Sequence, residues 1–205
     1  QAYHSTGTCT FYGTANTNQL IAEAMGFQLP GAAFTPTESP VREYLNKESL
    51  EALMRLMDSE IGLGEMLDIK NWMNALIVLL ASGGSTNLVI HLIAMARSAG
   101  YILTIEDFND LSSIIPLLCQ VYPNGTADVN EFHSEGGIAR LLSNLMEGDL
   151  IYKDIETVAG FGLESYTKIP YIDKKNAKNL KWKDLDQNQN TKSISTIDNP
   201  FKCNG

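Results

Sequence analysis

The residue best suited to chemistry near the start of the chain is Cys9, within Gly7-Thr8-Cys9-Thr10-Phe11-Tyr12-Gly13-Thr14-Ala15-Asn16. A thiolate binds metals or acts as a nucleophile, and the free N–H groups and partial positive charge of a helix N-terminus stabilise it. A helical pattern begins at about Asn16, just beyond this segment, and Gly7 and Gly13 permit close approach of a bulky ligand. Taken alone, these residues favour the simpler alternative, an inert cysteine buried in a Gly/Thr turn.

A second candidate is Gly83-Gly84-Ser85-Thr86-Asn87, which separates two predicted helices. The first N–H groups of the second helix could hold a carboxylate or a phosphate, although a capped helix corner explains the same residues. His91 follows Asn87 by one helical turn, so both side chains could reach one ligand. A hydrogen-bonded or exposed histidine is the simpler interpretation of His91.

The two other cysteines carry weaker signals. Cys119 lies among apolar residues, which predicts core packing, and nothing marks Cys203. Three cysteines without regular spacing indicate neither a disulfide framework nor a zinc site, and they are typical of a reducing cytoplasm.

Composition excludes several classes of partner. The 205 residues are 44% hydrophobic and 19% charged, as expected for one globular domain or a domain with a tail. A net charge of −9 argues against binding to nucleic acid or anionic lipid. No signal peptide is visible, and the longest apolar run, 75–81, is too short to span a bilayer. Because the chain begins without Met, we expect it to be part of a longer polypeptide.

Helical periodicity dominates the chain. A helix is predicted from about Asn16, capped by Asn16 or Thr14, and another from Asp68 to Ser82, with a buried parallel strand over 75–81 as the alternative. A core-facing stripe is predicted for a helix within 41–59, at Leu50, Leu53, Met54 and Met57.

Strand signals are few and short, at 101–103 and 117–122, and the polar segment 174–192 is predicted to be a mobile surface loop. An all-β fold is therefore excluded. The residues are compatible with an α-rich domain or with the α-rich portion of an α/β domain.

The chain resembles the family that joins dihydroxy-acid dehydratases and 6-phosphogluconate dehydratases. The segment around Cys9 is similar to the cluster-cysteine motif of the 6-phosphogluconate branch. Segment 174–192 has no counterpart that we can match. The other similar segments are Leu29-Pro30-Gly31, Gly83-Gly84-Ser85-Thr86-Asn87 with His91-Leu92, Tyr122-Pro123-Asn124-Gly125 with Ala127-Asp128-Val129-Asn130, and Val158-Ala159-Gly160-Phe161-Gly162-Leu163.

The resemblance implies the α-rich portion of a larger layered α/β N-terminal domain, to which residues 1–205 would all belong. It also implies a hydro-lyase of the Entner–Doudoroff pathway that converts 6-phospho-D-gluconate to 2-keto-3-deoxy-6-phosphogluconate. Cys9 would bind an iron–sulfur cluster that acts as Lewis acid on the C3 hydroxyl, and a 4Fe–4S cluster is favoured over 2Fe–2S. Ser85, Thr86 and Asn87 would contact substrate, whereas the catalytic base is not identified.

The resemblance further implies that the other cluster cysteines and the ligands of a divalent metal such as Mg²⁺ lie outside this chain. The chain alone is then expected to be inactive, and the full-length enzyme to be a homodimer. Two alternatives stay open: a dehydratase of the same family acting on a dihydroxy acid or sugar acid, and a non-catalytic α-helical interaction module in which Cys9 is inert.

Overall fold

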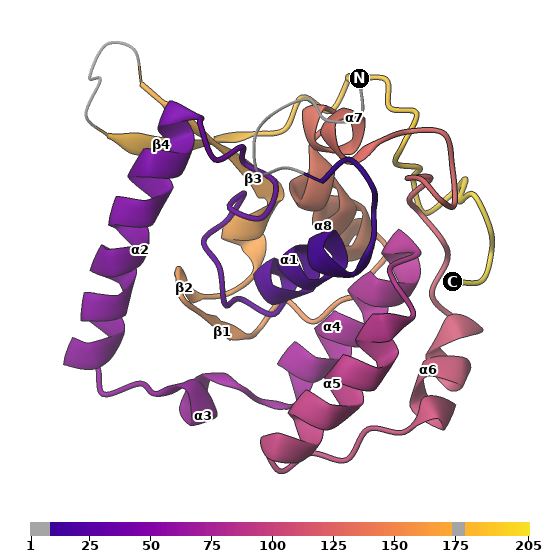
Figure 1. The fold of residues 1–205 in the computed structure, drawn as a ribbon, viewed down its shortest axis with the longest axis horizontal. Coiled ribbons are helices and arrows are strands. Elements are labelled where there is room, and N and C mark those ends of the chain that lie inside the picture. Colours follow the sequence, from indigo (N-terminus) through magenta and orange to yellow (C-terminus); the bar gives the residue numbers. More distant parts are fainter. Residues whose placement is uncertain (1–8, 174–178) are drawn as a thin grey trace.

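The structure, a computed structural model, describes residues 9–173 and 179–205 (Figure 1). It is rich in helix and poor in strand, as predicted. Its strands form two antiparallel ribbons, β1 (Glu156–Thr157) with β2 (Gly160–Phe161) and β3 (Lys168–Ile172) with β4 (Leu180–Asp184). The helices are α1 (Thr14–Ala24), α2 (Pro40–Asp58), α3 (Leu63–Met66), α4 (Ile69–Ser82), α5 (Asn87–Ser98), α6 (Ile105–Ser112), α7 (Val129–Ser134), α8 (Gly137–Glu147) and the 3-10 helix η1 (Glu164–Thr167).

The central element is α4, which contacts α1, α5 and α6. Asp68 and Asn71 form a capping box at its start, and Gly83 ends it with a positive φ of 61°. Nearly every side chain from Trp72 to Ala81 is buried. The helix prediction for 68–82 is therefore confirmed, and the alternative of a parallel strand over 75–81 is wrong.

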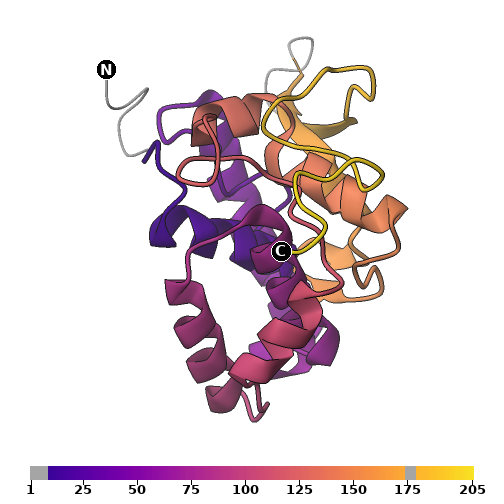
Figure 2. The ribbon, with the colours of Figure 1, turned by 90° about the vertical axis from the view of Figure 1, so that its right-hand side faces the viewer.

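The other elements surround this helix. In Figure 2, α5 and α6 (magenta) lie at the lower end of the molecule, and most of the yellow C-terminal segment lies at the upper end. That segment bonds to the chain after α6, where Gln120 N donates to Ser193 O over 2.8 Å. None of the helices in the described part of the chain has both the length and the apolar composition needed to cross a membrane.

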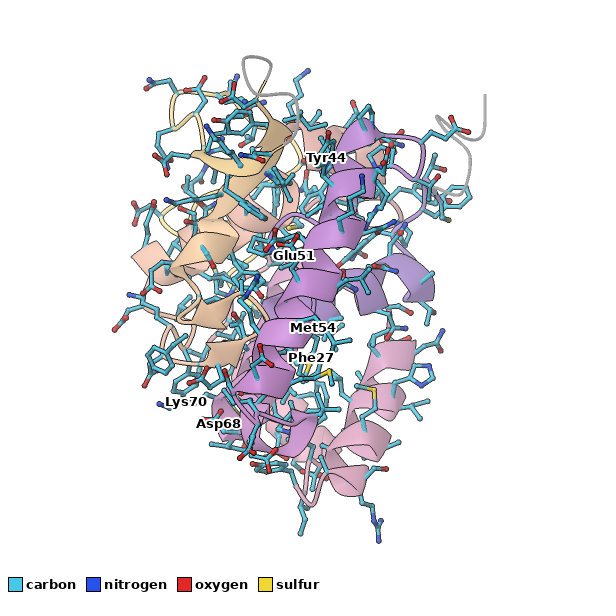
Figure 3. All side chains as sticks on the ribbon, turned by 90° about the vertical axis from the view of Figure 1, so that its left-hand side faces the viewer. Phe27, Tyr44, Glu51, Met54, Asp68 and Lys70 are labelled. Atoms are coloured by element: carbon cyan, nitrogen blue, oxygen red, sulfur yellow. The ribbon has the colours of Figure 1, made fainter. Side chains whose placement is uncertain are left out.

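The predicted core stripe on α2 is wrong. Its four side chains are between 53% and 65% exposed, whereas Leu45 and Ala52 are buried. The reason is that α2 packs through a different face, on the β3–β4 ribbon and on Leu29 and Ala32. Figure 3 shows α2 at the surface, with the labelled Tyr44, Glu51 and Met54 placed along it. The exposed stripe consists of Leu50, Leu53, Met54 and Met57.

The predicted polar loop over 174–192 is wrong for Leu180–Asp184, which form β4; residues 174–178 lie outside the described residues. Within β4, Leu180 and Trp182 pack against the core around α2, and the alternate lysines face solvent. The Trp182 indole N–H donates to the carbonyl of Pro30 over 2.9 Å. These two half-buried side chains, together with the pairing to β3, hold a strand in a polar sequence.

Neither of the two predicted short strands forms a regular strand in the structure, but for different reasons. Segment 101–103 is a loop, because Tyr101 donates its hydroxyl to Leu67 O (3.2 Å) and Ile102 points to solvent. Segment 117–122 is extended, but it makes isolated bridges, including Cys119 with Ile194, rather than a ladder. Helix α7, with a capping box of Asp128 and Glu131, is an element that the periodicity did not predict.

Glu23 of α1 fastens the loop that contains Leu29-Pro30-Gly31. Its buried carboxylate accepts hydrogen bonds from Gly31 N (2.6 Å) and Ala33 N (2.8 Å). Burial raises the pKa of Glu23 to about 7, although these N–H donors and the Arg42 guanidinium oppose the shift. Gly31 adopts φ +77°, and a Cβ there would lie 2.3 Å from the Pro170 side chain, so only glycine fits.

Mutation can distinguish the buried apolar residues of α4 from the exposed apolar residues of α2. We expect Leu76→Ala, in the fully buried part of α4, to lower the free energy of unfolding by about 2–5 kcal/mol. The matched change Leu50→Ala, on the exposed face of α2, should change it by less than about 0.5 kcal/mol. Urea unfolding of both variants measures this. An equal loss in both would contradict the exposed position of Leu50.

Glu23 gives the fold a pH dependence of known sign. Its pKa rises from 4.5 in the unfolded chain to about 7 in the fold, so the folded state holds the proton more tightly. The contribution of this group to stability is therefore fully present below pH 4.5 and falls by roughly 3 kcal/mol as the pH rises to 7. The variant Glu23→Gln lacks this loss, so its stability relative to the parent chain should increase over that range. A difference independent of pH would contradict the assignment.

Candidate functional site

Cys9 lies half-buried in the loop that leads into α1. Three elements hold this loop through its backbone. Val129 N of α7 donates to Thr10 O over 3.2 Å, Tyr12 N donates to Tyr122 O over 3.1 Å, and the Asn16 amide of α1 bonds to carbonyls of the loop. The cysteine is thus presented on a fixed backbone, whereas Gly7 and Thr8 of the same motif lie outside the described residues.

Aromatic side chains anchor the loop on both sides. The buried Tyr12 hydroxyl donates to Ser82 Oγ over 2.8 Å at the end of α4, and burial raises the pKa of Tyr12. Phe11 is exposed, and its ring centroid lies 5.3 Å from that of Tyr122. The loop is therefore attached to α4 through its interior and to the 122–125 turn at its surface.

The structure brings the second candidate segment to the same place. Thr14 Oγ1, in the first turn of α1, lies 3.1 Å from Ser85 Oγ and accepts a hydrogen bond from Asn87 Nδ2 over 2.7 Å. Thr17 Oγ1 accepts from Ser85 N over 3.1 Å. Two segments about 70 residues apart in the chain therefore lie side by side, and the N-termini of α1 and α5 meet there.

The two glycines of this corner are required by their surroundings. Gly83 has a positive φ, and its carbonyl accepts from the Asn124 amide over 2.7 Å. A Cβ on Gly84 would lie 2.6 Å from both Thr17 Cγ2 and Leu79 Cδ1, so α1 and the corner can approach only because this position is glycine. Close packing, and not only a helix end, explains the Gly-Gly pair.

The site combines one thiol with neutral hydroxyl and amide groups at two helix N-termini. Gly13 gives α1 no side-chain cap and Thr86 makes no capping bond, although Ser85 Oγ accepts a hydrogen bond from Asn87 N over 3.4 Å at the start of α5. The predicted capping of α1 by Asn16 or Thr14 is therefore wrong, because the helix already begins at Thr14. Such termini carry partial positive charge and favour anions.

The remaining predicted residues lie apart from this arrangement or at its edge. Cys119 is fully buried in the core, as predicted, and burial raises the pKa of its thiol. Cys203 is exposed near the C-terminus. Thr86, Asn87 and His91 are exposed around the start of α5. Within 9–173 and 179–205, no three or more His, Cys, Asp or Glu side chains are grouped so that they could hold a metal ion.

Sequence reasoning missed several residues that build the site. Thr14, Asn16 and Thr17 were treated as the start of a helix, yet their side chains bond to the cysteine loop and to the Gly-Gly corner. Asn124 looked like part of a turn, but it reaches Gly83. One signal in the sequence could have indicated them: short polar side chains recur at Thr14, Asn16 and Thr17, at the start of a predicted helix.

Comparisons with known proteins identify the family of the chain. Residues 1–166 match the sequence profile of the family described as "Dihydroxy-acid/6-phosphogluconate dehydratase N-terminal". The chain is 42% identical over 208 residues to the phosphogluconate dehydratase of Escherichia coli (strain K12) and 43% identical over 211 residues to that of Rhizobium meliloti (strain 1021). Each alignment covers 100% of this chain and 34% of the relative.

A more distant relative is the dihydroxy-acid dehydratase of Sulfurisphaera tokodaii, 38% identical over 170 residues, which are 81% of this chain and 30% of that protein. The chain therefore spans about a third of the length of these relatives. Since the family profile matches most of the chain, the chain belongs to the dihydroxy-acid/6-phosphogluconate dehydratase family.

Proposed function

We propose that this chain is part of a hydro-lyase that dehydrates 6-phospho-D-gluconate to 2-keto-3-deoxy-6-phosphogluconate in the Entner–Doudoroff pathway. The relatives that match the whole chain at 40–43% identity bear the name phosphogluconate dehydratase. The observation that carries the proposal is the meeting of the first turn of α1, which directly follows the Cys9 loop, with the corner at residues 83–87 and the start of α5.

Cys9 fits the role of one ligand of an iron–sulfur cluster. Cys9 is half-buried and is not part of a stripe of core-facing apolar residues. Its loop is held by hydrogen bonds to α1, α7 and the 122–125 turn. One thiolate does not hold a cluster, and Cys119 is enclosed in the core. The proposal therefore places the other cluster ligands, and those of a divalent metal such as Mg²⁺, in the remainder of the full-length protein, with a 4Fe–4S cluster favoured over 2Fe–2S.

When bound, the cluster supplies a Lewis acid for the departing C3 hydroxyl. The residues of this chain bind and orient. The N-termini of α1 and α5 favour an anionic substrate, and Ser85, Thr86 and Asn87 offer hydroxyl and amide groups to the sugar acid. Thr14, bonded to Ser85 and Asn87, fixes the direction of these groups.

Several consequences belong to the same proposal. Residues 1–205 form part of the N-terminal, cluster-binding domain, and they are inactive by themselves because the cluster cannot assemble on Cys9 alone. The full-length enzyme is a cytoplasmic homodimer. Turnover of 6-phosphogluconate by the isolated 205-residue chain, after anaerobic cluster reconstitution, would contradict the first consequence.

A second candidate substrate is a dihydroxy acid, since one relative of this chain is named dihydroxy-acid dehydratase. Identity favours the phosphorylated sugar acid, at 42% over the whole chain against 38% over 81% of it. Comparing the full-length enzyme on 6-phosphogluconate and on 2,3-dihydroxyisovalerate separates the two. Faster turnover of the second substrate would reverse the assignment.

Replacing the proposed cluster ligand gives the first functional prediction. In the full-length protein we expect Cys9→Ser to lose most of its iron and inorganic sulfide and to lower kcat by at least about 100-fold, because a hydroxyl is a poor ligand for cluster iron. Iron and sulfide are measured per chain, beside the rate of 6-phosphogluconate dehydration.

The matched control is Cys203→Ser, since Cys203 is exposed and distant in sequence from the site. It should leave both iron content and rate unchanged. Unaltered iron and activity in Cys9→Ser would support the remaining alternative, an α-helical interaction module with an inert cysteine.

The polar groups at the start of α5 give a prediction about substrate binding. Because a hydrogen bond to a charged group contributes about 1.5–3 kcal/mol, Asn87→Ala should lower kcat/KM of the full-length enzyme roughly 10- to 100-fold. The control His91→Ala, one turn further along the exposed surface of α5, should have little effect. Steady-state kinetics on 6-phosphogluconate measure both; parent-like kinetics for Asn87→Ala would remove Asn87 from the substrate site.

A further inference from the structure

We propose that Asn16 is the positioning residue of the cysteine loop, and that its side-chain amide sets the direction in which the Cys9 thiol meets the cluster. This inference rests on the proposed function, because it assumes that Cys9 is a cluster ligand. It concerns a residue whose side chain lies behind the loop, with only 9% of its surface exposed.

The geometry is unusual in that one amide group serves two carbonyls of the same loop. Asn16 Nδ2 donates to Cys9 O over 2.9 Å and to Phe11 O over 2.6 Å. The carbonyl between them, Thr10 O, accepts from Val129 N. Three consecutive peptide groups are therefore fixed, two of them by Asn16.

These bonds connect the cysteine to a rigid element. Asn16 lies in the first turn of α1, and the following Thr17 N donates to Gly13 O over 3.0 Å within the same turn. Because the Cys9 carbonyl is held, the peptide plane after Cys9 cannot rotate freely. The orientation of its Cα–Cβ bond then follows from the position of α1, which limits the thiol to the positions that rotation about χ1 allows.

The role requires an amide. Asparagine offers two N–H hydrogens on one nitrogen, one for each carbonyl. Aspartate has the same shape, but its carboxylate would place a charged acceptor against two carbonyl oxygens and would repel both. Alanine removes both donors without adding repulsion. The two substitutions therefore disturb the loop to different degrees while leaving Cys9 intact.

The consequence for the cluster is a change in how tightly it is held. Groups that orient a metal ligand without touching the metal typically contribute 10- to 100-fold in affinity. We expect the full-length Asn16→Asp and Asn16→Ala proteins, assembled anaerobically, to release iron to a chelator about 10- to 100-fold faster than the parent enzyme, with Asp faster than Ala. We also expect an altered EPR spectrum of the reduced cluster, which general loss of stability would not produce.

The matched control is Asn18→Asp, on the same helix. Asn18 is exposed and, unlike Asn16, donates to Thr14 O within the helix over 3.2 Å, so its variant should release iron at the parent rate. Circular dichroism and thermal unfolding of all variants report the fold. If Asn16→Asp does not fold, Asn16→Ala decides by the same two readouts.

The outcomes separate this inference from the proposed function. Iron loss in Cys9→Ser, together with parent-like iron release and EPR spectra in a folded Asn16 variant, would overturn the role of Asn16 and leave the cluster assignment standing. Full iron content in Cys9→Ser would overturn the cluster assignment, and this inference with it. Faster iron release and an altered EPR spectrum in the Asn16 variants, but not in Asn18→Asp, support the positioning role.

Discussion

The burial of α4 is the constraint on which the rest of the structure depends. From Trp72 to Ala81 its apolar side chains leave little surface to solvent, and burying each large one contributes about 1.5–3 kcal/mol. A helix buried on all sides has one permitted position among its neighbours. The place where it ends, at Ser82 and Gly83, is fixed for the same reason, and the candidate site is built at that end.

The site depends on small residues as much as on polar ones. Gly84 lets Thr17 of α1 approach the corner, and the Tyr12 hydroxyl reaches Ser82 inside the protein. The first turns of α1 and α5 then share hydrogen bonds between their side chains. A reactive cysteine in a flexible loop would have no defined direction, whereas this loop is bonded to three elements that the core already fixes.

Much of this could be predicted from local sequence, because helix caps and apolar periodicity are local. The helix from Asp68 to Ser82 and its buried course follow from such signals. The side of α2 that is buried could not be predicted in this way. Its stripe at Leu50 and Met54 has ideal helical spacing, yet the partner surface offered by the loop at Leu29 and the strand β4 lies against another face. Which face is buried is decided by elements distant in the chain.

In the candidate site, too, some features could be predicted from local sequence and others depend on contacts between distant segments. The residue types mark Cys9 and the Gly-Gly corner as candidates, but that the start of α1 meets this corner is a property of the tertiary structure. The resemblance to the dehydratase family had already assigned both segments to one active site, Cys9 as a cluster ligand and residues 85–87 as substrate contacts. It could not indicate the hydrogen bonds of the Asn16 side chain to the Cys9 and Phe11 carbonyls, since a bond from a side chain to the backbone leaves no pattern in one sequence.

The central claim is that the Cys9 sulfur binds cluster iron. The most direct measurement is anomalous X-ray diffraction at the iron edge, on anaerobically grown crystals of the full-length protein. The account predicts an iron peak within bonding distance of Cys9 Sγ, with the loop backbone held as described. Iron bound only by other residues, with the Cys9 sulfur directed into the protein, would contradict it.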